Sequence, residues 1–118
     1  MRIGFDIDDT MSRHWPFFSL ITRALVHDGH EVIVITFRSD RQLAAEELSE
    51  RGILWSELVV ADQAEIDTIG FAQWKGEICR RRGVELFFDD MPEVINHLPE
   101  STVGMMSVLP EQGLVYYD

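Results

Sequence analysis

Cysteine is almost absent from this chain of 118 residues, since Cys79 is the only one. No intrachain disulfide can form, and one chain cannot supply a cluster of thiolate metal ligands. The sequence also lacks an uncharged apolar run long enough to cross a bilayer. Acidic charge enters at Asp6, before the pattern of a secretory signal is complete. These absences predict a cytoplasmic protein that does not insert into membranes.

Positive charge is also scarce. Lysine and arginine number 10 against 21 acidic residues, the formal net charge is -11, and Lys75 is the only lysine. Broad binding to nucleic acid or to anionic membranes relies on basic surface, so the composition argues against both. The one basic run, Arg80 to Arg82, falls at the end of an expected helix, where cations complement the helix dipole.

The remaining composition is typical of a globular domain, with 46% hydrophobic and 26% charged residues. A chain of this length forms one hydrophobic core. No internal repeat, low-complexity stretch or linker divides it. The sequence therefore predicts a single domain that spans residues 1–118.

Five short apolar runs alternate with amphipathic segments. Most of these runs are continuous, as in strands that are buried on both faces of a parallel sheet. The expected strands are Arg2 to Ile7, Glu31 to Phe37, Leu58 to Ala61, Val84 to Phe88 and Thr102 to Ser107. The alternation predicts an α/β fold: a three-layer, doubly wound, Rossmann-like and mainly parallel five-stranded sheet. The tail from Leu114 to Tyr117 is not assigned.

Four helices are expected between the strands. They begin near Trp15, at a Ser39–Gln42 capping box, at Phe71 and at Pro92, and the first three end at Gly29, Gly52 and Gly83. Gly76 should weaken the third helix by about 1 kcal/mol relative to alanine. The apolar residues expected on the buried faces are Leu20, Ile21, Ala24, Leu25, Leu43, Ala44, Leu48, Phe71, Trp74, Ile78, Val94, Ile95 and Leu98.

Polar residues gather where the apolar runs stop. Three carboxylates lie within four positions at the end of the first run, and such a group needs a counter-cation because the charges repel one another. Ligands of open parallel sheets bind at the carboxyl ends of the strands, so separate segments can converge on one crevice. The residues at these ends are Asp6, Asp8, Asp9, Thr10, Thr36, Asp89 and Asp90, and Lys75 offers a positive charge.

The ordered set of these residues resembles the four motifs of the haloacid dehalogenase superfamily of phosphotransferases. Motif one is matched by Asp6, Asp8 and Thr10, motif two by Thr36, motif three by Lys75, and motif four by Asp89 and Asp90. Motif two and the lone lysine are weak signals by themselves, whereas the order across the whole chain is specific. The resemblance implies a fold like that of this superfamily and a phosphatase activity on phosphate monoesters.

The resemblance also implies Mg²⁺ as the cofactor, because this hard cation prefers carboxylate, carbonyl and water oxygens. Its expected ligands are Asp6, the main-chain carbonyl of Asp8, and Asp89. Asp90 would hold a metal-bound water or Lys75.

By the same resemblance, Asp6 attacks phosphorus to form an aspartyl phosphate, and Asp8 protonates the leaving oxygen and then activates water. Thr36 would donate a hydrogen bond to the phosphoryl group, and Lys75 would offset the negative charge on that group and on Asp6. The start of the helix near Ser39 would add amide donors. The sequence leaves open whether the phosphoenzyme passes its phosphate to water or to another acceptor.

Two features depart from the family pattern. Many relatives carry glycine where this chain has Asp9, although some phosphatases of the family also read Asp-x-Asp-Asp-Thr. Neither usual insertion point contains a cap domain, since residues 8–15 leave room for a short flap and residues 62–73 for a loop. The pattern therefore resembles the uncapped branch of the family.

An uncapped crevice admits a phosphorylated metabolite, a nucleotide or a larger phosphorylated polymer, unless a second copy of the chain in a homo-oligomer covers it. By position, the candidate substrate contacts are His14, Trp15 and Arg38, together with the loop 62–73. Each also has a simpler interpretation: a solvated histidine, a tryptophan that packs at a helix start, and an arginine in a surface ion pair.

Three other interpretations compete. A response-regulator receiver domain would use Asp8, Asp9 and Asp62, but the sequence offers no lysine after the fifth strand and leaves Asp89 and Asp90 unexplained. An EF-hand calcium loop requires glycine where Met11 stands. A catalytically inactive metal-binding or regulatory module of the same fold stays open, because fold does not fix function.

Overall fold

The protein is described here by a computed structural model, in which residues 1–108 are placed. Its centre is a five-stranded sheet in the order β3-β2-β1-β4-β5, and all four pairings are parallel. The strands are β1 (Arg2–Phe5), β2 (Glu31–Ile35), β3 (Glu57–Val59), β4 (Leu86–Asp89) and β5 (Val103–Met106). All five predicted strands are confirmed, with ends that differ by at most two residues. The fold is α/β and is compatible with a Rossmann-like arrangement.

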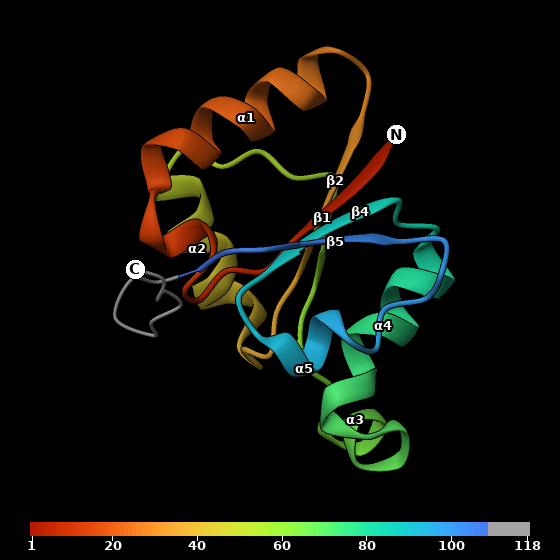
Figure 1. The fold of residues 1–118 in the computed structure, drawn as a ribbon. Coiled ribbons are helices and arrows are strands. Elements are labelled where there is room, and N and C mark those ends of the chain that lie inside the picture. The colour runs from red at the N-terminus through yellow and green to blue at the C-terminus, as the bar shows by residue number, and fades with distance from the viewer. Residues whose placement is uncertain (109–118) are drawn as a thin grey trace, which may run out of the picture.

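Helices cover both faces of the sheet and make three layers (Figure 1). The helices α1 (Trp15–His27) and α2 (Arg41–Glu50) lie on one face, and α4 (Phe71–Arg82) and α5 (Pro92–Ile95) lie on the other. Alternate residues of β2 follow this division, because Val32 and Val34 join one apolar cluster whereas Ile33 and Ile35 join the other. This is the burial that the continuous apolar runs predicted.

The strand order decides one of the competing interpretations. Receiver domains place their strands in the order 2-1-3-4-5, in which the third strand lies beside the first. Here β3 is an edge strand and β4 lies beside β1. Asp62 follows the edge strand and accepts a hydrogen bond from the Glu65 amide as the N-cap of the next helix. The receiver-domain interpretation is therefore wrong.

The face that α1 buries differs from the prediction. Leu20 is exposed, whereas Phe18, Ser19 and Thr22 are buried. Thr22 can be buried because its hydroxyl donates to the Phe18 carbonyl at 2.7 Å and accepts from the Leu54 amide at 3.2 Å. Side chains that satisfy their hydrogen bonds internally are invisible to a search for apolar periodicity.

The start and the buried face of α2 differ from the prediction. The N-cap of α2 is Asp40, whose side chain accepts from the Leu43 amide at 3.0 Å, and not Ser39. Leu43 is exposed, while the predicted Ala44 and Leu48 are buried.

Residues 62–73 were expected to be a loop, but most of that segment is the helix α3 (Gln63–Ile69), and a short 3-10 turn, η1 (Met11–Arg13), precedes α1.

The third predicted helix is confirmed at both ends, since α4 spans Phe71–Arg82 and Gly83 follows in the left-handed region at φ +64°. Trp74 and Ile78 are buried as predicted, although Phe71 is exposed. In α5, Val94 is buried. The unassigned tail from Leu114 to Tyr117 lies outside the described residues.

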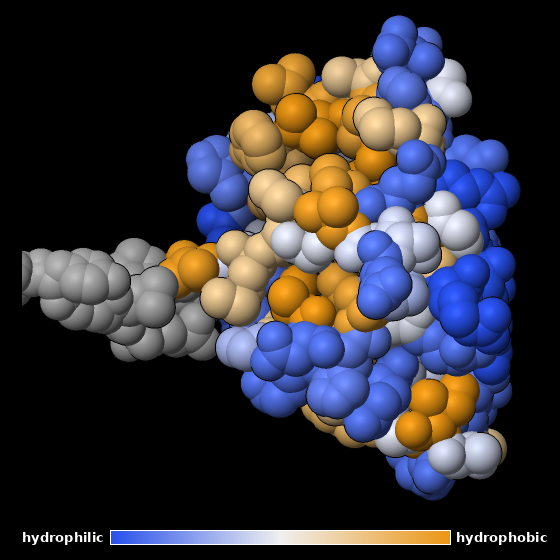
Figure 2. Space-filling model, turned by 45° about the vertical axis from the view of Figure 1, so that its right-hand side comes forward, coloured by the Kyte–Doolittle hydropathy of each residue, from blue (hydrophilic) through white to orange (hydrophobic). Residues whose placement is uncertain are grey.

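The surface is not uniformly polar. Figure 2 shows apolar side chains in several groups on one face of the molecule. Exposed large apolar side chains of the described residues include Phe17 and Leu20 of α1 and Val103, Met105 and Met106 of the edge strand β5. None of the described helices is long and apolar enough to span a membrane.

Gly76 is explained by a close approach between α4 and the segment after α5. A Cβ at this position would lie 2.2 Å from the His97 carbonyl oxygen and 3.1 Å from its carbon. Both are backbone atoms, which cannot rotate away as a side chain would. The glycine thus lowers the intrinsic stability of α4 but allows the helix to approach its neighbour.

We therefore expect Gly76→Ala to lower the free energy of unfolding by about 1–3 kcal/mol through overpacking, despite the better helix propensity of alanine. Urea unfolding followed by circular dichroism measures this. Gly104→Ala is the matched control, because its Cβ would meet only side-chain carbons of Leu98 and Ile95 at 3.0–3.2 Å. A Gly76→Ala protein as stable as the wild type would contradict the close approach.

Candidate active site

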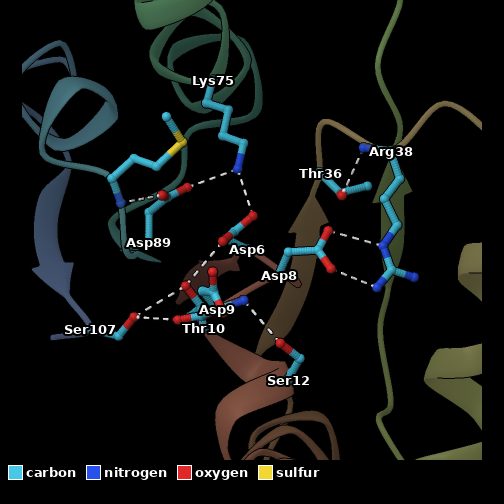
Figure 3. A network of polar contacts seen from close by, with 11 residues as sticks. Asp6, Asp8, Asp9, Thr10, Ser12, Thr36, Arg38, Lys75, Asp89 and Ser107 are labelled. Carbon is cyan, nitrogen blue, oxygen red and sulfur yellow. Dashed lines mark hydrogen bonds and ion pairs between the residues drawn. The ribbon is translucent and has the colours of Figure 1, made fainter. Parts of the chain in front are cut away.

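The polar residues converge at the carboxyl ends of the two central strands. Asp6 follows β1 directly, Asp89 is the last residue of β4, and these strands are neighbours in the sheet. The Asp6 amide donates to the Phe88 carbonyl at 2.9 Å, so the two strand ends are held in register. Figure 3 shows the two aspartates facing the same space together with Lys75. The sheet thus brings together residues that are far apart in the sequence.

Lys75 reaches this point from α4 and binds both carboxylates. Its Nζ donates to Asp6 Oδ1 at 2.7 Å and to Asp89 Oδ2 at 2.8 Å. All three side chains are buried, with 1%, 7% and 0% of their surface exposed for Lys75, Asp6 and Asp89. The ammonium also lies 4.5 Å from the centre of the Phe37 ring. A buried lysine is tolerated here because it is paired twice.

One lysine does not balance the acidic groups at this site. Oxygens of Asp6, Asp89 and Asp90 all lie within 4.8 Å of one another. Burial, together with the charge of Asp89, raises the pKa of Asp6 to about 7, although Lys75 opposes the shift. Burial also raises the pKa of Asp90. A compact group of carboxylate oxygens that resists ionisation fits a hard divalent cation such as Mg²⁺.

The turn after β1 holds the second oxygen of Asp6. Thr10 is buried, and its hydroxyl donates to Asp6 Oδ2 at 3.0 Å. Asp9 is the one described non-glycine residue with a positive φ, at +60°, and its amide donates to Ser12 Oγ at 2.9 Å. This left-handed conformation favours glycine and is tolerated by aspartate.

Asp8 turns away from Asp6 and toward Arg38 (Figure 3). Its two oxygens accept from Arg38 Nη2 at 2.8 Å and from Nε at 3.0 Å, and Arg38 also binds Glu47 at 2.6 Å. The hydrogen bonds from Arg38 hold the pKa of Asp8 below its ordinary value. Thr36 is buried nearby, and its Oγ1 accepts from the Arg38 amide at 3.1 Å. Arg38 therefore orders this side of the site.

The expected substrate contacts have structural partners. His14 is exposed, as its simpler interpretation predicted, and it also caps α1, with Nδ1 accepting from the Phe17 amide at 3.2 Å. Trp15 packs against the core, and the guanidinium of Arg51 lies 5.5 Å from its ring centre, as the packing interpretation predicted. Arg38 occupies the ion pair that was the simpler of its two interpretations.

Asp90 was expected to hold a metal-bound water or Lys75. The two carboxylates that bind Lys75 are Asp6 and Asp89, so the contact of Asp90 with a metal-bound water stays a prediction. Asp90 lies within the group of three acids that can share a cation. It is half-buried and follows β4, which places it at the mouth of the site.

One residue of this network was missed in the sequence. Ser107 lies just beyond β5, and its hydroxyl donates to the Asp9 carbonyl at 3.0 Å and lies 3.3 Å from Thr10 Oγ1. The signal that found the other residues, a polar side chain where an apolar run stops, also applies to Ser107. It was read only as the end of a strand.

The raised pKa of Asp6 predicts a pH-dependent stability of the metal-free protein. The pKa of Asp6 is about 7 in the folded state, whereas its ordinary value is 3.8. The folded protein therefore holds this proton more tightly than the unfolded chain does. Between these values the folded state binds more protons than the unfolded chain, so the free energy of unfolding falls as pH rises. Asp90 acts in the same direction.

Thermal melts in chelator should therefore show a Tm that falls from about pH 4 to pH 7 and then levels, with at most about 1.4 kcal/mol per pH unit from Asp6. Asp6→Asn should remove most of this slope. Asp28→Asn is the matched control, because the Asp28 side chain is 82% exposed. Equal slopes in all three proteins would contradict the buried, proton-binding Asp6.

Arg38 gives a second titration prediction. Because its hydrogen bonds are the largest cause of the low pKa of Asp8, Arg38→Gln should raise that pKa toward the ordinary value of 3.8. Carbon-13 NMR of the aspartate carboxyl groups measures the change. Arg51→Gln should leave the pKa of Asp8 unchanged, since Arg51 lies over the ring of Trp15. If the pKa of Asp8 is the same in Arg38→Gln as in the wild type, the ion pair between Asp8 and Arg38 does not persist in solution.

Comparison with known proteins does not identify a family for this chain. No family model, no curated protein and no solved structure matches the chain. The resemblance of the four sequence motifs to the superfamily therefore stays a prediction.

Proposed function

We propose that the protein is a cytoplasmic, Mg²⁺-dependent phosphomonoester phosphohydrolase of the haloacid dehalogenase type, which acts through an aspartyl phosphate on Asp6. The observation that supports this most is the buried contact of Lys75 with both Asp6 and Asp89 at the carboxyl ends of adjacent strands. A lysine held between two acids stabilises anions, and its burial makes each interaction stronger than it would be in water.

The acidic cluster suits a cation that joins protein and phosphate. A phosphate monoester carries close to two negative charges near neutral pH. Oxygens of Asp6, Asp89 and Asp90 would hold Mg²⁺, and the resemblance adds the main-chain carbonyl of Asp8. The bound ion would neutralise phosphoryl charge and keep Asp6 ionised.

In this proposal Asp6 is the nucleophile, and the contacts of its two oxygens support that role. Lys75 and Thr10 fix its two oxygens at 2.7 Å and 3.0 Å, so the carboxylate has little freedom to rotate. In the proposed first step, an Asp6 oxygen forms a bond to phosphorus while the bond to the leaving oxygen breaks. Lys75 offsets charge on the phosphoryl oxygens, and Thr36, from the end of β2, donates a hydrogen bond to them.

Asp8 would give a proton to the leaving oxygen and then take one from the attacking water. Its contact with Arg38 favours the ionised form, so Asp8 must leave this contact to act as an acid. An anionic substrate that approaches the mouth of the site competes for the Arg38 guanidinium, which gives a route to that change. Arg38 thus also becomes a candidate contact for the substrate.

The proposed site has no cap, and the lengths of the connections support this. A 3-10 turn joins β1 to α1, and the seven-residue helix α3 is the added element between β3 and α4. Neither is large enough to close over a substrate. Such a site would accept a small phosphorylated metabolite, a nucleotide or a larger phosphorylated polymer. A second copy of the chain would be the simplest cover in a homo-oligomer.

One observation favours a second candidate function. Asp8, the proposed acid, is engaged by Arg38 with a lowered pKa, as expected for a structural ion pair. A protein that binds a divalent cation at Asp6, Asp89 and Asp90 without chemistry would need nothing more. This metal-binding or regulatory module predicts cation binding with no turnover.

The deciding experiment is phosphate release from a panel of phosphorylated metabolites, nucleotides, 3'-phosphorylated oligonucleotides and phosphopeptides. We expect activity that requires Mg²⁺, stops with chelator, and falls at least about 1,000-fold in Asp6→Asn because the nucleophile is lost. Asp28→Asn, the same chemical change at an exposed site, should keep wild-type activity.

The other outcomes are distinct. Full activity in Asp6→Asn would eliminate the aspartyl phosphate. Heat release on Mg²⁺ titration without turnover on any substrate would favour the metal-binding module. Neither metal binding nor turnover would contradict both candidates.

A further inference from the structure

We infer that Ser107 is a positioning residue for Asp6, acting through the hydroxyl of Thr10; this inference rests on the proposed function. Ser107 belongs to the last described segment, just beyond β5, and lies in none of the four motifs. It is nevertheless the residue of that segment whose side chain enters the polar network around Asp6 (Figure 3).

Ser107 contacts three parts of the site. Its amide donates to the Asp89 carbonyl at 3.0 Å, which fixes the end of β5 against the end of β4. Its hydroxyl donates to the Asp9 carbonyl at 3.0 Å and lies 3.3 Å from Thr10 Oγ1. Ser107 is half-buried; its contact with Thr10 is partly shielded from water, whereas its contact with the Asp9 carbonyl is exposed.

Counting hydroxyl protons gives the contacts a direction. Thr10 has one hydroxyl proton, and it is committed to Asp6 Oδ2 at 3.0 Å. Thr10 can therefore only accept from Ser107, which shares its own single proton between the Asp9 carbonyl and Thr10 Oγ1. The result is a chain in which Ser107 reaches Thr10 through the longer branch of a shared hydrogen bond, and Thr10 donates to Asp6. Each donor in such a chain strengthens the next.

This chain matters because it restrains the oxygen of Asp6 that Lys75 does not hold. Lys75 fixes Oδ1, while Thr10 binds Oδ2. Without Ser107, the hydroxyl of Thr10 loses the neighbour that keeps it aligned. Asp6 would then sample orientations that are not suited to attack on phosphorus, which lowers the rate of the chemical step without removing any contact to substrate.

Ser12 gives a matched control for a general loosening of the turn that contains Asp9. Ser12 also holds Asp9, by accepting from its amide at 2.9 Å, but its contact is with the backbone of Asp9 and not with the hydroxyl of Thr10. Ser12→Ala and Ser107→Ala therefore each remove one hydrogen bond to the same turn residue. Only Ser107→Ala also removes the chain to Asp6.

Kinetics and structures together test the inference. We expect Ser107→Ala to lower kcat about 3- to 10-fold, as for one lost hydrogen bond, with KM within about twofold of wild type. Ser107→Thr, which restores the hydroxyl, should recover most of the rate. Ser12→Ala should lower kcat by less than half as much as Ser107→Ala, even at an equal loss of Tm.

Crystal structures of the wild type and of Ser107→Ala give a readout that needs no activity. The variant should show Thr10 in more than one rotamer, or with its hydroxyl turned away from Asp6 Oδ2. If Thr10 and Asp6 keep one unchanged arrangement, the positioning role is wrong. Unchanged kcat in Ser107→Ala, no rescue by threonine, or an equal effect of Ser12→Ala would each overturn it as well. A wild type without turnover would contradict the proposed function, while the structures would still decide on Ser107.

Discussion

The contact of Lys75 with Asp6 and Asp89 is the interaction on which the rest of the site depends. Two buried carboxylates on adjacent strands would repel each other at the centre of the sheet, and the ammonium between them makes that burial tolerable. It also ties α4 to both central strands. The close approach at Gly76, the next residue, sets how deeply this part of α4 lies in the molecule.

The site has two sides with opposite electrostatic character. Around Asp6, three acids share one lysine, so this side lacks positive charge. Around Asp8, the guanidinium of Arg38 satisfies the carboxylate fully and holds it ionised. A cation would supply the positive charge that is missing around Asp6, whereas an anion near Asp8 would have to displace that carboxylate from Arg38. A phosphate ester bound together with a divalent cation would supply both the cation and the anion.

The strands and the positions of motifs one, two and four could be predicted because each is a local change from apolar to polar residues, and such a change needs no knowledge of tertiary contacts. The same holds for α4, whose end is marked by Gly83. Lys75 lies inside α4 and was singled out because it is the only lysine. The strand order was not predicted, since it depends on which edges meet. It is the order that places Asp6 beside Asp89 and removes the receiver-domain interpretation.

The errors come from side chains whose hydrogen bonds compete with simple patterns. Asp40 and Ser39 are both good caps, and only the path of the chain out of β2 selects Asp40. His14 is exposed as expected, but its role as a cap was missed because nothing in the sequence marks it as the acceptor for the Phe17 amide. Ser107 was passed over because its partner, Thr10, is 97 residues away in the chain.

The pairing of Phe5 with Phe88 also has a consequence for how the protein is made. Asp6 is synthesised well before the helix that carries Lys75 and the strand that carries Asp89. Contacts of such sequence separation form only after a large loop has closed. A nascent chain therefore displays the acidic motif as ordinary, fully hydrated aspartates, and the buried environment of Asp6 arises only when β1 and β4 pair.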